Sequence, residues 1–191
     1  MKKSFILLSL VIAFILAGCS DSSKNDYKMI EQSNNFKLYA YENDDEIYSD
    51  YVCFIFNNAG KKIASSYYET KQPDLHTFDN GVLRVFINAG TSAGLSTYYN
   101  LETSAVSETY QCVYYDDGEI VIYIHYDESD TYICAKEIFG SDFLLKEKLD
   151  TGNTFITGFE VDFSDGVVTV EHPKGEQYDD TIVETFELNR K

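Results

Sequence analysis

Residues 113–135 have the sequence VYYDDGEIVIYIHYDESDTYICA, and this stretch decides the fold class. It holds three alternating runs of β-branched and aromatic residues, which favour strands. Asp117-Gly118 and Glu128-Ser129 separate the runs, and Asp-Gly supplies the positive φ angles that tight hairpins need. The stretch therefore predicts three antiparallel strands, with Tyr115 opposite Ile120 and Tyr126 opposite Thr131.

Following this register outward separates two faces of the predicted sheet, because side chains alternate with a period of two. One face is aliphatic and should be core. It holds Val113, Ile120, Ile122, Ile124, Ile133 and Ala135. The opposite face is rich in tyrosine. It holds Tyr110, Cys112, Tyr114, Val121, Tyr123, His125, Tyr132, Cys134 and Lys136.

The tyrosine-rich face has two interpretations. Tyrosine offers a flat apolar ring with a polar tip, which suits an aromatic platform for sugar rings or an extended peptide. The alternative is packing against a second sheet, because sandwiches and stacked blades bury both faces of a central sheet. The candidate binding residues are Tyr110, Tyr114, Tyr123, His125 and Tyr132.

The same register predicts free cysteines. Cys112 and Cys134 lie on strands two apart, so their Cα atoms should be about 10 Å apart, beyond the roughly 7 Å limit for a disulfide. Any bridge would have to involve Cys53. We expect buried thiols that behave as small hydrophobic side chains.

The rest of the chain repeats these strand and turn signals. Aromatic residues make up 15% of the chain, prolines number only 2, and no stretch carries a long helical period. Asp79-Asn80-Gly81, Asp117-Gly118 and Asp165-Gly166 mark turns at intervals of roughly 40 to 50 residues, near the length of a four-stranded propeller blade. The strands expected in addition lie at residues 36–41, 51–56, 82–87, 95–100 and 143–149.

These signals predict one all-β domain over residues 36–191. Its antiparallel meanders and hairpins should form a sandwich or an irregular stack of propeller-blade-like sheets. Residues 19–35 are polar with little periodicity, and we expect them to form a flexible tether.

A hairpin centred on Asp165-Gly166 predicts an acidic patch. Phe159, Val161, Phe163, Val168 and Val170 should face the core. Glu160, Asp162 and Glu171 should face outward, with Glu160 directly opposite Glu171. Like charges across a ladder cost up to about 1 kcal/mol, which a bound cation or a basic partner would relieve. The alternative is a solvated edge strand whose charges block aggregation.

Composition restricts the partners. The chain carries 32 acidic and 15 basic residues, a formal net charge of −17. Such a surface repels nucleic-acid phosphates, so we expect no nucleic-acid binding. It favours cationic partners, although high charge also serves solubility alone. His76, His125 and His172 lack ligand spacing, and the oxygen-rich residues 43–46 and 179–180 lack the spaced glycine of a calcium loop, so we expect no metal and no cofactor.

One motif is associated with catalysis. Gly90-Thr91-Ser92-Ala93-Gly94 matches the G-x-S-x-G pattern of the hydrolase nucleophile elbow. That elbow must pass from a strand into a helix, but residues 95–100 are predicted to form a strand. A serine hydrolase acting through Ser92 is therefore the most distant functional alternative, and we expect no enzyme.

The N-terminus carries an export signal. Lys2-Lys3 precede the apolar residues 5–16, and this order is typical of a secretory signal peptide. The apolar stretch is shorter than the roughly 20 residues that a transmembrane helix needs. Leu16-Ala17-Gly18-Cys19 resembles the lipobox of bacterial lipoproteins. The resemblance implies removal of residues 1–18 and a covalent lipid on Cys19.

Together these features predict a lipoprotein held by its lipid on the extracytoplasmic side of the cell envelope, at the plasma membrane or an outer membrane. The expected role is a non-catalytic binding module for a glycan, a peptide or a cationic protein. The alternative is a structural or assembly component of the envelope.

Overall fold

The computed structural model describes residues 27–41, 50–69, 71–90, 94–128, 130–151, 158–174 and 180–189. These residues form fifteen β-strands and no helix. The strands are β1 (Tyr27–Gln32), β2 (Phe36–Tyr41), β3 (Asp50–Phe56), β4 (Lys62–Tyr68), β5 (Asp74–Thr77), β6 (Val82–Asn88), β7 (Gly94–Asn100), β8 (Val106–Gln111), β9 (Val113–Asp116), β10 (Ile120–Asp127), β11 (Asp130–Glu137), β12 (Phe143–Lys148), β13 (Glu160–Ser164), β14 (Val167–Lys174) and β15 (Asp180–Glu187).

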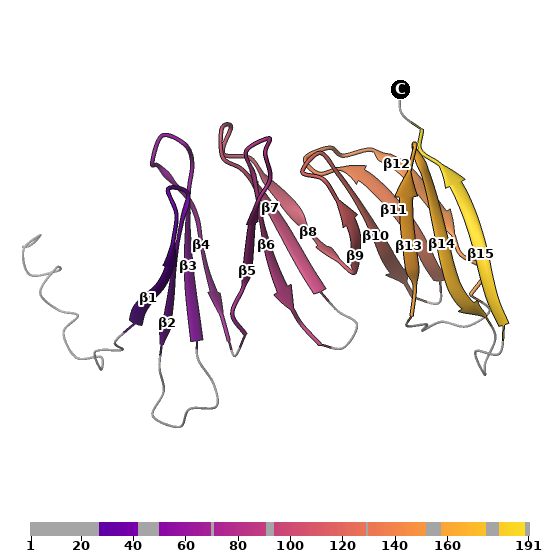
Figure 1. Ribbon diagram of the computed structural model, residues 1–191, viewed down its shortest axis with the longest axis horizontal. Coiled ribbons are helices and arrows are strands. Elements are labelled where there is room, and N and C mark those ends of the chain that lie inside the picture. The colour runs from indigo at the N-terminus through magenta and orange to yellow at the C-terminus, as the bar shows by residue number, and fades with distance from the viewer. Residues whose placement is uncertain are drawn as a thin grey trace, which may run out of the picture.

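The strands form four antiparallel sheets in chain order. They are the sheets β1–β4, β5–β8, β9–β12 and β13–β15, and within each sheet every strand pairs with its neighbour in the chain. The sheets follow one another in a row, with β1–β4 and β13–β15 at opposite ends of the molecule (Figure 1). The prediction of an all-β chain of antiparallel meanders is therefore confirmed, and the meanders are stacked like blades.

Three apolar layers hold the four sheets together. The first joins Leu38 and Ile55 of sheet β1–β4 to Leu83 of the next sheet. The second layer lies between sheets β5–β8 and β9–β12, and the third between β9–β12 and β13–β15. The two inner sheets are thus covered on both faces, whereas each end sheet has one apolar layer and one outer face.

The register of the central hairpins is partly as predicted. Tyr126 pairs with Thr131, as expected. Tyr115, however, pairs with Ile122 instead of Ile120. Asp116 pairs with Val121, so the loop from β9 to β10 is two residues longer than the two-residue turn that was expected. The prediction for this hairpin was wrong in register, but the shift of two preserves which side chains share a face.

A β-bulge in β9 changes those faces further along. Tyr115 pairs with Ile122 and Val113 pairs with Tyr123, so Tyr114 is the extra residue on the bulged strand. Cys112 next to it has a φ of 49°, and its carbonyl accepts a hydrogen bond from the amide of Ile124. The bulge places Val113 in the second apolar layer and Cys112 against the third, the reverse of the prediction.

The prediction of a flexible tether over residues 19–35 was wrong for residues 27–32, since Tyr27–Gln32 forms strand β1 on the edge of the first sheet. The segment pairs with β2 because its backbone completes the edge ladder, although its side chains are largely exposed. Residues 1–26, which include Cys19, lie outside the described part of the chain.

The Asp165-Gly166 turn is as predicted. Asp165 and Gly166 have φ angles of 52° and 81°, the two positive values of a type I′ hairpin. The strands on either side pair Glu160 with Glu171 and Val161 with Val170. The turn chemistry therefore fixes the register that the sequence predicted for this hairpin.

Candidate interaction surfaces

The tyrosine-rich face predicted at the centre of the chain is interior. Tyr110 is 2% exposed and Tyr123 is 8% exposed, and both lie in the second apolar layer. Their ring centroids are 5.1 Å apart, and Tyr98 packs edge-on against Tyr110 at 5.9 Å. Burial raises the pKa of both Tyr110 and Tyr123 above the usual range of tyrosine. Tyr110 belongs to β8 and Tyr123 to β10, so the two rings meet between the sheets β5–β8 and β9–β12 and form no open platform.

The other three candidate residues of that face lie apart from this layer or at its margin. Tyr114 is turned by the bulge, and its ring lies 6.4 Å from the ring of Phe159. His125 is exposed near the end of β10, with its ring 6.5 Å from that of Tyr132. Lys146 Nζ lies 5.1 Å from the centre of the Tyr132 ring. The structure therefore does not bring the five predicted binding residues together on one surface.

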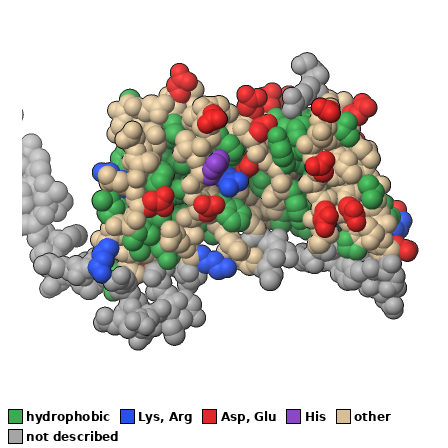
Figure 2. All heavy atoms as spheres, in the orientation of Figure 1, with side chains coloured by type: hydrophobic (Ala, Val, Ile, Leu, Met, Phe, Trp, Pro, Cys, Tyr) green, Lys and Arg blue, Asp and Glu red, His purple; other side chains and the backbone are tan. Residues whose placement is uncertain are grey.

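The predicted acidic patch, by contrast, is on the surface. Glu160 and Glu171 are directly opposite each other across β13 and β14, and both are exposed. Val183 of β15 continues this row and is 59% exposed. Figure 2 shows acidic side chains gathered over this end of the molecule. The acidic end face comprises Glu160, Asp162, Thr169, Glu171, Val183, Thr185 and Glu187.

The acidic end face has no basic partner among the described residues. Within the described residues no ion pair is formed by Glu160, Asp162, Glu171 or Glu187. Several carboxylates elsewhere do form ion pairs. These pairs are Asp116 with Arg84, Glu108 with Lys136, Asp130 with Lys148, Asp150 with Lys174 and Glu184 with His172.

At the opposite end of the stack lies an aromatic surface that the sequence analysis did not predict. It is the outer face of the sheet β1–β4, opposite the face that carries Leu38, Cys53 and Ile55. Tyr67 and Met29 are 53% and 51% exposed there. The aromatic end face comprises Tyr27, Met29, Lys37, Tyr39, Tyr41, Asp50, Val52, Phe54, Phe56, Lys62 and Tyr67.

Contacts within the aromatic end face show that these side chains share one side of the sheet. The rings of Tyr39 and Phe54 meet edge to face at 5.8 Å. Lys62 Nζ lies 5.6 Å from the centre of the Phe54 ring, and Lys37 Nζ lies 5.7 Å from that of Phe56. The signal that could have revealed this face is the alternation in residues 36–41 and 51–56, where the intervening positions are Leu38, Ala40, Cys53 and Ile55.

Asp50 is the acidic member of the aromatic end face. Its carboxylate accepts a hydrogen bond from the Tyr67 hydroxyl, and this bond is the main cause that raises the pKa of Tyr67 to about 12. Asp50 is therefore engaged by a tyrosine, while the ammonium groups of Lys37 and Lys62 lie over aromatic rings.

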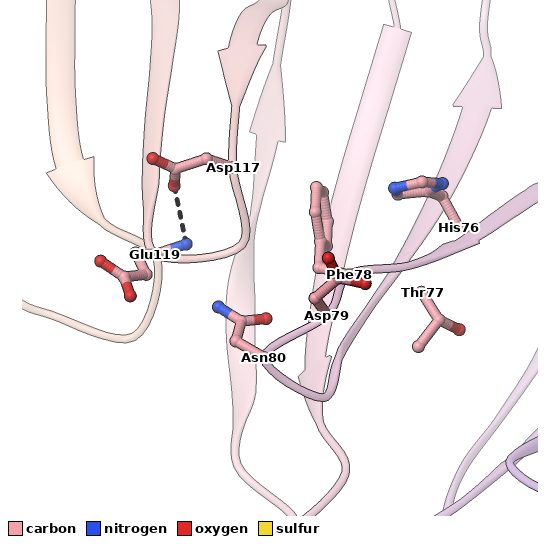
Figure 3. Close-up of a pocket in the computed structure, with 7 residues that line it drawn as sticks. All are labelled: His76, Thr77, Phe78, Asp79, Asn80, Asp117 and Glu119. Atoms are coloured by element: carbon pink, nitrogen blue, oxygen red, sulfur yellow. Dashed lines mark hydrogen bonds between the residues drawn. The ribbon is translucent and has the colours of Figure 1, made fainter.

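A hollow of about 360 Å³ lies between the turn after β5 and the turn after β9. Figure 3 shows His76 on one side, Asp117 and Glu119 on the other, and Asn80 between them. Asp117 Oδ1 accepts hydrogen bonds from the amides of Glu119 and Ile120, both at 2.8 Å, so this carboxylate closes its own turn. The lining residues are explained by the two hairpins and form no cluster of catalytic groups.

The remaining candidate positions fall partly outside the described residues. Ser92 is one of these, but its flanks form the antiparallel pair β6 and β7, not the strand and helix of a nucleophile elbow. Residues 43–46 and 179 also lie outside. Among the described residues no group of three His, Cys, Asp or Glu side chains could hold a metal ion. In that same part of the chain no helix could cross a membrane.

Cys53, Cys112 and Cys134 form no disulfide, as predicted. Cys53 and Cys134 are completely buried, and burial raises their pKa values to about 12 and about 11. These cysteines are therefore packed as protonated side chains and not as nucleophiles.

Comparison with known proteins finds a solved structure with a weak similarity to this chain. No family model matches the chain, and no curated protein matches it. A solved structure of the β-propeller domain of the Trilobed protease from Pyrococcus furiosus, described as having an open velcro topology, is similar over 86% of this chain and 55% of that chain. The identity is 11% and the TM-score is 0.42. The chain thus spans about half the length of that domain.

Proposed function

We propose that this chain is an extracytoplasmic lipoprotein, held to a membrane by a lipid on Cys19, and that its β stack is a non-catalytic module that binds a basic protein or peptide. The binding surface is the acidic end face. The observation that carries the proposal is the row of carboxylates there that no described basic residue pairs with, in which Glu160 stands directly opposite Glu171.

The electrostatics of this row favour a cationic ligand. Glu160 and Glu171 repel each other across the ladder, and the described residues offer them no basic partner. A lysine or arginine from a ligand would relieve this repulsion. What sets the acidic end face apart is that two of its glutamates stand directly opposite each other, so an incoming basic group there relieves a repulsion between like charges.

An apolar residue beside the carboxylates further restricts the kind of ligand that fits this surface. Val183 stands beside Glu171 in the same row and is 59% exposed. Lysine and arginine bury their aliphatic stems on apolar surface while the charged end stays accessible. The row therefore suits a basic segment that lies along the sheet, with its stems on Val183 and its charges on the two glutamates.

The experiment measures binding of lysozyme, as a representative basic protein, to immobilised full-length lipidated protein. The double variant Glu160→Gln/Glu171→Gln should bind about tenfold more weakly, which corresponds to about 1.4 kcal/mol. The matched control Glu102→Gln/Glu147→Gln removes the same charge at exposed positions outside the acidic end face and should bind as the parent does. Equal loss in both double variants would mean that only net charge matters, and the proposed surface would be wrong.

The anchor is tested separately by feeding cells an alkyne analogue of palmitate. The parent and Cys112→Ser should both incorporate the label, and Cys19→Ser should not. Label that persists in Cys19→Ser would overturn the assignment of the lipid to this residue.

A further inference from the structure

Among the described residues, no other sheet or loop is packed on the aromatic end face, which is an extended surface. Four ring or cation contacts join its side chains to one another, and Tyr67 and Met29 are 53% and 51% exposed on it. Soluble monomers rarely expose a large contiguous apolar patch unless it contacts a partner or a membrane. We therefore expect a partner molecule or a membrane to cover this surface.

The position of Cys19 restricts what that occupant can be. Cys19 precedes Tyr27 by eight residues, and a fully extended chain spans at most about 3.6 Å per residue. A lipid on Cys19 therefore holds Tyr27 within roughly 29 Å of the bilayer. Tyr27 belongs to the aromatic end face, since its ring lies 5.5 Å from that of Tyr41. The end of the stack nearest the anchor is thus the aromatic one (Figure 1).

The residue types on this face match the chemistry of a membrane surface. Tyrosine places an apolar ring toward acyl chains and its hydroxyl toward water, which is why it is enriched at bilayer interfaces. Lysine extends its ammonium toward headgroups while its stem stays on apolar surface. Lys37 and Lys62 lie among the rings of this face, with Nζ of Lys37 5.7 Å from the centre of the Phe56 ring and Nζ of Lys62 5.6 Å from that of Phe54.

Charge distinguishes the two ends of the stack. Within the described strands of sheet β1–β4, the aromatic end face carries two basic residues, Lys37 and Lys62, and one acidic residue, Asp50, and the exposed Glu69 follows Tyr67 just after β4. The acidic end face carries four carboxylates, and none of the outward positions of β13, β14 and β15 is basic. An anionic bilayer attracts basic groups close to its surface and repels acidic ones. In a chain of net charge −17, this difference selects the aromatic end for the membrane side.

From these observations we propose that the aromatic end face lies on the bilayer surface, as a second membrane contact beside the lipid on Cys19. This inference rests on the proposed anchor. It orients the stack with the sheet β1–β4 at the membrane and the acidic end face pointing away from it, toward basic partners. Docking of this face limits the rotation that a lipid-tethered domain would otherwise have.

The test uses a single tryptophan as a reporter, because the chain contains none. Full-length lipidated protein is reconstituted into phosphatidylcholine and phosphatidylglycerol vesicles, with or without bromine on the acyl chains. Tyr67→Trp places the reporter on the aromatic end face. Val183→Trp is the matched control on the acidic end face, at a position of similar exposure. Bromine quenches emission only at short range, so the reporter responds to contact with the bilayer.

We expect brominated vesicles to lower the emission of Tyr67→Trp about twofold and to leave that of Val183→Trp unchanged, since interfacial segments sit about 5 to 10 Å into the headgroup and acyl boundary. Adding Lys37→Glu/Lys62→Glu should remove most of the quenching while the protein still floats with the vesicles. This second result tests the charged component of the contact without disturbing the anchor.

Other outcomes overturn the inference. Flotation without quenching of Tyr67→Trp would mean that the anchor holds but the face does not touch lipid, and a cross-linked dimer in that sample would identify a second copy as the occupant. Equal quenching of both reporters would mean that the stack lies on its side. Protein that fails to float would refute the proposed anchor and with it this contact.

Discussion

The hydroxyl of Tyr110 donates a hydrogen bond of 2.9 Å to the carbonyl oxygen of Ile138. Tyr110 is in β8 and Ile138 follows β11, so this bond joins the second sheet to the third across a buried apolar layer. The chemistry of tyrosine would suit an exposed binding platform, but here the hydroxyl of Tyr110 satisfies a carbonyl group in the interior. The bond explains why tyrosine and not phenylalanine occupies this position.

Tyr110→Phe should therefore destabilise the stack by about 1 to 2 kcal/mol, because it removes the bond and leaves a buried carbonyl without its partner. The change in the free energy of unfolding is measured by urea denaturation, with the same dependence on urea concentration for variant and parent. Tyr67→Phe removes a hydroxyl from an exposed ring and should stay within about 0.5 kcal/mol of the parent. Equal effects of the two variants would show that the Tyr110 bond contributes nothing to stability.

Asp116→Ala should be among the most destabilising single changes, at about 3 kcal/mol, because it leaves a partly buried cation without its carboxylate. Asp116 Oδ2 accepts bonds from Arg84 Nη1 at 3.0 Å and from the Tyr98 hydroxyl at 2.6 Å. The control is Asp74→Ala, whose carboxylate is 68% exposed and 3.9 Å from Arg84 Nη2. Chemical denaturation should find the control nearly neutral, and a control as costly as Asp116→Ala would count against this explanation.

Gly118→Ala should cost more stability than Gly166→Ala. Both glycines have a positive φ, 86° and 81°, so both variants carry the strain of a left-handed residue, roughly 1 kcal/mol. A Cβ at position 118 would also lie 2.7 Å from Asn80 Oδ1 and 2.9 Å from Phe78 Cβ, whereas position 166 has open space. The difference between the two melting curves isolates the contact between the turns of neighbouring sheets.

Glu171→Gln should raise stability by up to about 1 kcal/mol, since it removes the repulsion with Glu160 across the ladder. The gain should shrink in high salt, which screens exposed charges. Thermal unfolding at low and high salt checks both statements. Combined with Glu160→Gln the same change should weaken binding of lysozyme, so stability and binding move in opposite directions if the acidic end face is a binding surface.

Stability should decline as the pH rises above about 9. Burial raises the pKa of Cys53 to about 12 and of Cys134 to about 11, and it raises the pKa of Tyr110 and Tyr123 as well. The folded protein therefore keeps protons that the unfolded chain releases near its ordinary values of 9 and 10. The unfolded state then binds fewer protons, so the free energy of unfolding falls with pH.

Urea midpoints measured from about pH 8 to about pH 11 should follow this decline. The variant Cys53→Ala should show a shallower decline than the parent over the same range. A midpoint that stays constant across it would contradict the assignment of these groups as buried acids.

The sequence determined the strands and most of their turns, because both depend on local properties. Alternation of aromatic and β-branched residues defines where a strand runs, and Asp165-Gly166 fixes the register of its hairpin through two positive φ angles. The pairing of Glu160 with Glu171 followed from that turn. The residues Asp117-Gly118 did not determine the register of their hairpin, since the Asp117 carboxylate stabilises a longer loop by accepting bonds from the amides of Glu119 and Ile120.

Tertiary structure decided what covers each face. A period of two separates the sides of a sheet without stating whether a second sheet, solvent or a membrane lies against them, and tyrosine suits all three. Tyr110 and Tyr123 became interior because they lie on the facing sides of the second and third sheets, while Tyr39 and Tyr67 stayed outside because the first sheet has a neighbour on one side. The β-bulge at Tyr114 is a second feature that depends on tertiary structure. Its position follows from the stacking of the sheets and not from local strand propensity.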